Sequence, residues 1–287
     1  MRGWLLGLMW AGVAEAAEVE LQSAGEGERR VLQYEVSDGQ REKMHLVFDM
    51  EMAMDAMGTK RGGAAPTLDA WADMTAHTLP DGNFEVAFVY KKVKAKGGSG
   101  DLADPKVAEG LAKLKGLSGT YTVSPYGEIL STDIHMPEGF AGGQGLPFDM
   151  REIGARLPSE AVGVGAVWAV RSLVSTQIGM SFDQTATYHL VALDGASATL
   201  TVDIVQSAEP GPIDASAAGV DGLPAGAINL DHLNSAGSGR TVIRLDRLVP
   251  REGEMQMHMD MSMSMQMMGM AMTFAQDLKT HMDITGK

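Results

Sequence analysis

The chain has 287 residues, a formal net charge of −14 and 45% hydrophobic residues, which is ample for a folded core. So acidic a chain is unsuited to binding nucleic acid or anionic lipid surfaces through charge, and we expect no nucleic-acid partner. The absence of cysteine excludes disulfide bonds and cysteine nucleophiles. The 22 methionines are the most unusual feature of the composition.

The N-terminal segment has the features of a secretory signal peptide. Arg2 precedes an apolar run that ends in Ala14-Glu15-Ala16-Ala17, and a positive start, an apolar stretch and an A-x-A site are typical of such peptides. We expect cleavage near Ala16, which removes residues 1–16, and a flexible leader over 17–30. The apolar run is too short for a permanent membrane span. The mature protein is expected to be periplasmic or secreted in a bacterium.

The first expected strand, Val31–Val36, is apolar and precedes a turn at Asp38-Gly39. Beyond the turn, an apolar side chain occupies every second position from Met44 to Met54. Successive side chains leave a strand on opposite faces, so this alternation predicts a strand with one buried face.

Three hairpins are expected further along, each around a turn that contains glycine. Their arms are 72–78 with 84–93, 119–123 with 128–135, and 185–192 with 196–205. A separate strand is expected at 167–175.

Two helices and one long loop complete the middle of the chain. The first helix is expected over 104–116, because Asp104 suits the N-cap position and Pro105 the first helical position. The second is expected over 147–157. Residues 208–240 are rich in glycine and alanine and are expected to form a surface loop that could include a turn of helix near 228–234.

After a short strand at 242–249, methionine occupies every second position from Met255 to Met267. The residues between are Gln, His, Asp or Ser, which predicts a strand with a thioether face and a polar face. Both Met strands carry the pattern D-M-x-M-x-M-x-x-M-G, beginning at Asp49 and at Asp260. We interpret this as one β domain over 31–287 built from two related halves, about 31–135 and 147–287. Convergence of two sheet strands is the alternative.

Regular hairpins without strand–helix–strand alternation predict a mainly β, antiparallel fold. We expect an incomplete or flattened β-barrel of about 11–12 strands with two short helices. The alternating residues of both Met strands, with those of 84–90, are expected to face its interior. This expected wall comprises Met44, Leu46, Phe48, Met50, Met52, Met54, Phe84, Val86, Phe88, Tyr90, Met255, Met257, Met259, Met261, Met263, Met265 and Met267.

Enzymatic chemistry has little support in the sequence. The seven histidines are scattered without the spacing of a zinc helix, and no G-x-S-x-G elbow occurs. We therefore expect a protein that is not an enzyme and has no cofactor.

Three interpretations of the methionines remain open. Flexible thioethers fill irregular space, so the Met faces could form a filled core of a structural or interaction scaffold. They could instead line a cavity for an apolar ligand such as a lipid or acyl chain, and this is the interpretation we favour, because rigid cores in strands usually use Val, Ile and Phe. The third is a Cu(I) site that uses Met259, Met261, Met263 and Met265.

An export signal, about a dozen antiparallel strands and short helices resemble the LolA/LolB-type lipoprotein carriers, whose curved, incomplete barrel holds acyl chains under a helical lid. The Met-alternating strands that end in Met-Gly, with an Asp-Gly-Asn hairpin, resemble an uncharacterised family of exported bacterial β-proteins and lipoproteins. This chain departs from that family in lacking the lipid-bearing cysteine. The resemblance implies a β fold with an apolar concavity, and no settled activity.

Overall fold

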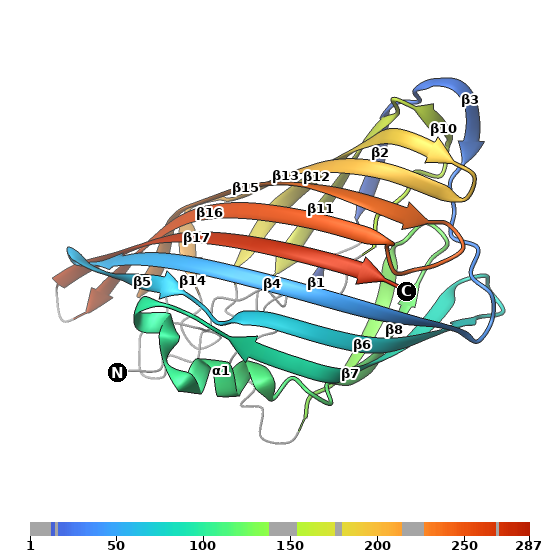
Figure 1. The fold of residues 1–287 in the computed structure, drawn as a ribbon. Helices are drawn as coiled ribbons and strands as arrows, with labels where there is room; N and C mark the ends of the chain where they lie inside the picture. Colours follow the sequence, from blue (N-terminus) through green and yellow to red (C-terminus); the bar gives the residue numbers. More distant parts are fainter. Residues whose placement is uncertain (1–12, 15–16, 138–153, 176–179, 214–226, 268–269) are drawn as a thin grey trace.

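The computed structural model describes residues 13–14, 17–137, 154–175, 180–213, 227–267 and 270–287 (Figure 1). Strands dominate these residues, with one α-helix and one 3-10 helix. The long strands that form most of the sheet are β4 (Gln40–Ala56), β6 (Thr67–Thr78), β7 (Phe84–Lys96), β12 (Ser181–Asp194), β13 (Ser197–Ala208), β15 (Ile228–Arg244), β16 (Glu252–Met267) and β17 (Met270–Gly286). The shorter strands are β1 (Val13–Ala14), β2 (Glu18–Ser23), β3 (Glu26–Val31), β5 (Thr59–Ala64), β8 (Ser118–Val123), β9 (Ile129–His135), β10 (Ala161–Val164), β11 (Val167–Ser175) and β14 (Gly211–Ile213).

One antiparallel sheet contains almost all of the described strands. Its neighbours follow the order β1-β11-β12-β13-β15-β16-β17-β4-β6-β7-β8-β9, while β2 pairs with β11, β5 with β4 and β14 with β15. The sheet bends, so that its two ends lie behind the central strands, and it does not close into a barrel (Figure 1). The expected mainly β, antiparallel, incomplete barrel is confirmed. Its three hairpins and the strand at 167–175 are present.

The two ends of the domain meet in the middle of this sheet. The chain runs outward from β4 to β9 on one side, returns to the other edge at β11, and runs inward to β17. There β17 pairs with β4, from Gly286 opposite Met44 to Phe274 opposite Ala56. As a result, the Met strands β4 and β16 lie on either side of β17.

The core lies within the space enclosed by the bent sheet, and one end of that space is closed by packed chain. Leu32, Tyr34 and Val36 are all buried there. The N–H of Glu35 donates to the carbonyl of Leu245 at 2.6 Å, three residues before the buried Leu248 and Val249. We call this the closed end. At the opposite end are the β4–β5 and β16–β17 hairpins, and we call it the hairpin end.

Two expectations for the N-terminal part are wrong. Residues 17–30 are not a loose leader, because β2 pairs with β11 and β3 pairs with β10. Their side chains are almost all exposed, so these strands are held by backbone hydrogen bonds at the edge of a sheet. Because neither face is buried, their sequence lacks the apolar alternation that would predict a strand. Residues Leu32–Val36 do not form a strand, although alternate side chains are buried. Their N–H groups donate to single carbonyls of separate segments and not to one neighbouring strand; the N–H of Tyr34, for example, donates to the carbonyl of Pro125.

The expected loop at 208–240 is also wrong. It contains β14 and most of β15, so residues 228–234 are strand and not helix. The expected strand at 242–249 ends at Arg244, and the chain then turns. Glycine, serine and asparagine in β15 resemble loop composition, although β16 pairs with residues 228–242 of this strand and β13 with residues 233–244. Strand β17 was not among the expected elements.

The first expected helix is present but shorter. Helix α1 spans Pro105–Ala112, follows a 3-10 turn at Gly100–Ala103, and begins where the Asp104 carboxylate accepts the N–H of Lys106. The second expected helix falls mostly outside the described residues, and its described part, 154–157, is not helical. Among the described residues, no helix has the length and hydropathy needed to cross a membrane. The signal peptide lies mostly outside the described residues, and it and the two related halves stay predictions.

Candidate functional site

The even-numbered residues of β4 form the first part of the inward face. Met44, Leu46, Phe48, Met50 and Met52 are all buried, while Met54 is half-buried near the hairpin end. The odd-numbered residues between them are half-buried or exposed. One face of β4 therefore packs on the core, as the alternation predicts.

The odd-numbered residues of β16 form the second part. Met259 and Met261 are buried, whereas Met255, Met257, Met263 and Met265 are only half-buried. Gln256, His258 and Asp260 are exposed on the other face. The side chain of Met267 lies outside the described residues.

Strand β17 joins these two rows into one continuous wall. In the register of the sheet, Leu278 lies opposite Met259 on one side and Met52 on the other. The adjacent rows, in the order β16, β17, β4, are Met255–Met282–Phe48, Met257–Thr280–Met50, Met261–Gln276–Met54 and Met263–Phe274–Ala56. We call this inward surface of β16, β17 and β4 the methionine wall.

Small residues of β15 make room for the wall. Gly237 and Gly239 lie opposite Met257 and Met255. A Cβ atom on Gly237 would lie only 2.6 Å from the Cγ atom of Met257, and one on Gly239 would lie 3.3 Å from the sulfur of Met255. The methionine side chains therefore lie over bare backbone of the neighbouring strand.

The aromatic row of β7 lies beyond β6 from the wall. Phe84, Val86, Phe88 and Tyr90 are buried and belong to the same core as the methionines. Phe88 packs edge-on against Tyr90, with ring centroids 6.2 Å apart. Of the expected wall residues whose side chains are described, all except Met54 and Met265 belong to or pack against one core. Strand β7 does not pair directly with either Met strand.

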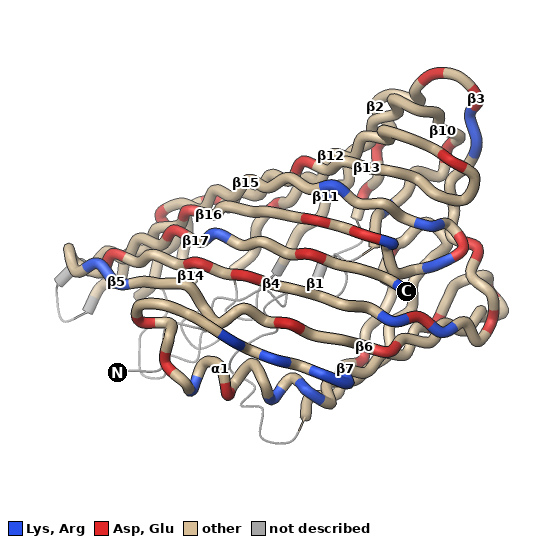
Figure 2. Tube along the Cα trace, in the orientation of Figure 1, with Lys and Arg blue, Asp and Glu red and all other residues tan. Residues whose placement is uncertain are grey.

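The opposite face of the same strands is polar. His258 lies 2.5 Å from Asp277, and His232 lies 2.6 Å from Asp260. Each of the seven histidines has an aspartate carboxylate within 4.0 Å. Charged residues lie along these strands, and Lys91, Lys92, Lys94 and Lys96 follow one another on β7 (Figure 2). The histidines therefore contribute to the outer surface and not to the methionine wall.

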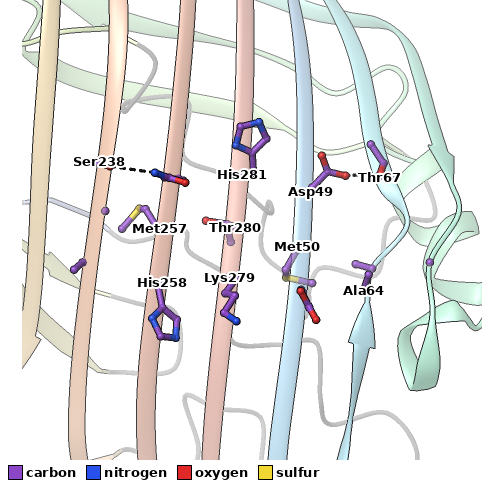
Figure 3. A pocket seen from close by; sticks show the side chains of 16 residues that line it. Asp49, Met50, Ala64, Thr67, Ser238, Met257, His258, Lys279, Thr280 and His281 are labelled. Carbon is purple, nitrogen blue, oxygen red and sulfur yellow. Dashed lines mark hydrogen bonds between the residues drawn. The ribbon is translucent and has the colours of Figure 1, made fainter.

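A groove of about 730 Å³ crosses the middle of β15, β16, β17 and β4 (Figure 3). The residues that line it include Asp49, Glu51, Gln256, His258, Lys279 and His281. These six residues occupy outward positions of their strands, whereas Met50, Met257 and Thr280, which also line the groove, belong to the methionine wall.

A small space lies inside, next to the methionine wall. Its volume is about 40 Å³, and its lining includes Tyr188, Val202, Met255, Met282 and Ile284. This is room for about one water molecule. A larger molecule can enter there only if the side chains around it move.

One carboxylate is buried at the closed end. Glu42 is 5% exposed, and its oxygens accept the N–H groups of Leu248 at 3.1 Å and Val249 at 3.2 Å. Burial raises the pKa of Glu42 above its usual value, although these two hydrogen bonds oppose the shift. Burial likewise raises the pKa of the Tyr34, Tyr90 and Tyr121 hydroxyls, which keeps them neutral.

Metal ligands of the usual hard or borderline kind do not gather in the described residues, which contain no group of three or more His, Asp or Glu side chains able to hold an ion. Thioethers do face one another across strands. Met265 lies opposite Met272, and Met255 lies opposite Met282. Cu(I) is the ion that such soft ligands select.

Sequence reasoning missed part of the wall and its polar residues. Met272, Phe274, Leu278, Met282 and Ile284 recur at even positions in β17, and this alternation was the signal available. Two buried polar residues, Gln206 of β13 and Ser235 of β15, also belong to the interior. The sequence analysis placed Gln206 next to an expected strand and Ser235 in an expected loop, and no sequence pattern shows that Gln206 Oε1 and Ser235 Oγ lack hydrogen-bond partners among the described residues.

Comparisons with known proteins give no family for this chain. No family model matches it, and no curated protein matches it. Among solved structures, a search found the crystal structure of Pseudomonas aeruginosa OccK11 (OpdR), with 6% sequence identity and a TM-score of 0.20 over 89% of this chain and 100% of that chain. A likeness this weak carries no argument about fold or function.

Proposed function

We propose that the protein is an exported, non-enzymatic carrier that binds an apolar molecule, such as a lipid or acyl chain, against the methionine wall. The observation that supports this most is the incomplete burial of inward methionines. Five methionines occupy strand positions that face the core but are only half-buried: Met54, Met255, Met257, Met263 and Met265. In a filled core these side chains would be as buried as Met44 and Leu46, which have no accessible surface.

The chemistry of methionine suits this role. An unbranched thioether has three rotatable bonds and can move aside to admit apolar molecules of different shape. The bare backbone at Gly237 and Gly239 leaves these side chains without a rigid neighbour on that side. We infer that the ligand enters at the hairpin end, because the wall is least buried there and the closed end is packed.

Ligand binding is tested with protein purified from the cells that make it and with an apolar probe. Native mass spectrometry should find a bound lipid, and N-phenyl-1-naphthylamine should fluoresce on binding. The variant Met257→Trp fills the space beside the wall and should weaken probe binding about tenfold or more. The control His258→Trp changes the next residue, on the outer face, and should leave binding unchanged. A ligand-free mass together with no probe binding would refute the proposal.

Cu(I) binding is the second candidate, supported by the opposed pair Met265 and Met272. The expected ligands remain Met259, Met261, Met263 and Met265. A Cu(I) competition titration with a chromogenic chelator decides it: replacing these four residues with leucine should abolish binding if the site exists. Binding no tighter than that of a methionine-poor control protein would remove copper from consideration.

A further inference from the structure

Two polar residues are buried side by side within the interior face of the sheet. Gln206 of β13 is 1% exposed and Ser235 of β15 is 4% exposed. They lie directly opposite each other in the register of these strands. Both have the parity of the core face, because Ile204 on β13 and Leu233 on β15, two positions away, are buried core residues.

Their hydrogen-bonding capacity is only partly used. Gln206 Nε2 donates to Oε1 of Gln184 at 2.6 Å. Gln206 Oε1 and Ser235 Oγ are buried and have no hydrogen-bond partner among the described residues. A buried polar atom without a partner is costly and rare, so two adjacent ones indicate a place where another molecule supplies the missing bonds.

The pair lies beside the methionine wall. Ser235 is opposite Met259, in the row that continues through Leu278 to Met52. In the next row towards the hairpin end, Gln276 donates from Nε2 to the sulfur of Met52 at 3.2 Å. Beyond Ser235 towards the closed end, the lining is bare glycine and methionine. The interior therefore has a polar spot in the central row of the sheet, with an apolar surface on the side of the closed end.

We propose that Gln206 and Ser235 bind the hydroxyl group of a hydroxyl-bearing lipid whose apolar chain lies against the methionine wall. This inference rests on the carrier function proposed above. Residues opposite each other in a sheet have Cβ atoms about 5 Å apart, so one oxygen can reach both side chains. The ligand hydroxyl donates to Gln206 Oε1 and accepts the proton of Ser235 Oγ.

The geometry favours a hydroxyl over other polar groups. An ether or ester oxygen accepts only, so it would leave Gln206 Oε1 without a donor. A carboxylate would also place acceptor against acceptor there, and would carry a charge into an apolar interior, which is unfavourable without a paired cation.

The test compares two isomeric ligands, decan-1-ol and 1-methoxynonane, by displacement of N-phenyl-1-naphthylamine from the full chain. They have the same atoms, but only the alcohol donates a hydrogen bond. Wild-type protein should bind the alcohol about tenfold more tightly. The variant Gln206→Met/Ser235→Ala should lose this preference while its affinity for the ether stays the same.

The chain provides a matched control on the outer face. Gln256 donates to Ser238 across β16 and β15, and both occupy positions that alternate with the inward residues of their strands. The variant Gln256→Met/Ser238→Ala should keep the preference for the alcohol. Equal binding of the two isomers by wild type, or a preference that survives in the inward variant, would overturn the inference and leave the carrier function standing. Failure of wild type to bind the probe and both isomers would refute both.

Discussion

Met259 and Met52, which are 207 positions apart in the chain, lie on either side of Leu278 in a single row across three strands. All three side chains are buried. This row joins the two Met strands through β17, and it is the central part of the methionine wall. The first prediction concerns its middle residue.

Replacing Leu278 with alanine should destabilise the protein by about 2–4 kcal/mol, because it removes buried methyl groups and leaves space between two methionines. Lys279→Ala, at the next and exposed position, should change stability by less than about 0.5 kcal/mol. Urea unfolding followed by circular dichroism measures both. Equal effects of the two substitutions would show that β17 does not present this face to the core.

The contact between Gly237 and Met257 predicts a measurable coupling. Gly237→Ala should destabilise the fold by about 1–3 kcal/mol, since the new Cβ would meet the Cγ of Met257 at 2.6 Å and the carbonyl oxygen of Gln256 at 2.8 Å. Adding Met257→Ala should relieve only the side-chain part of this clash. A double-mutant cycle should give a coupling of about 1 kcal/mol.

A matched glycine provides the control for that cycle. A Cβ atom on Gly211 of β14 would meet no neighbouring atom within 4 Å, so Gly211→Ala should be tolerated. Strictly additive effects of Gly237→Ala and Met257→Ala would contradict the packing of methionine over bare backbone.

Glu42 predicts how stability depends on pH. Burial raises its pKa in the folded protein above the usual value near 4.5, so between these two pKa values the folded state binds more protons than the unfolded state. Stability from this residue is therefore greatest at low pH and falls as pH rises through that window. Urea unfolding across the acidic range should show a shallower fall for Glu42→Gln than for wild type. A fall of the same slope in both proteins would assign the effect to other groups.

The sequence predicted the parts of the fold whose signal is local. Alternation placed the core face of β4 and of β16, and glycine turns placed the hairpins. It failed at β15, where Gly237, Gly239 and Ser235 look like loop residues. The two glycines are small because methionines from β16 lie over them. Local composition cannot register a requirement set by the neighbouring strand.

Long-range pairing was equally out of reach. Nothing in the pattern of β17 states that its partner is β4, more than two hundred residues earlier in the chain, yet this pairing creates the methionine wall. The strands β2 and β3 were not predicted, because backbone pairing alone holds them and their exposed side chains show no apolar alternation. That Gln206 Oε1 has no hydrogen-bond partner in the described part of the chain depends on the packing of three strands, β12, β13 and β15.

The most direct test of an apolar binding surface is nuclear magnetic resonance of the protein labelled with ¹³C at its methionine methyl groups, titrated with decan-1-ol. The account predicts that the methyl signals of Met257, Met255 and Met282, assigned by Met→Leu variants, shift in a saturable way. Met57, which is 69% exposed, and Met136, which is 43% exposed, should not move. Shifts confined to Met57 and Met136, or no shifts at all, would contradict it.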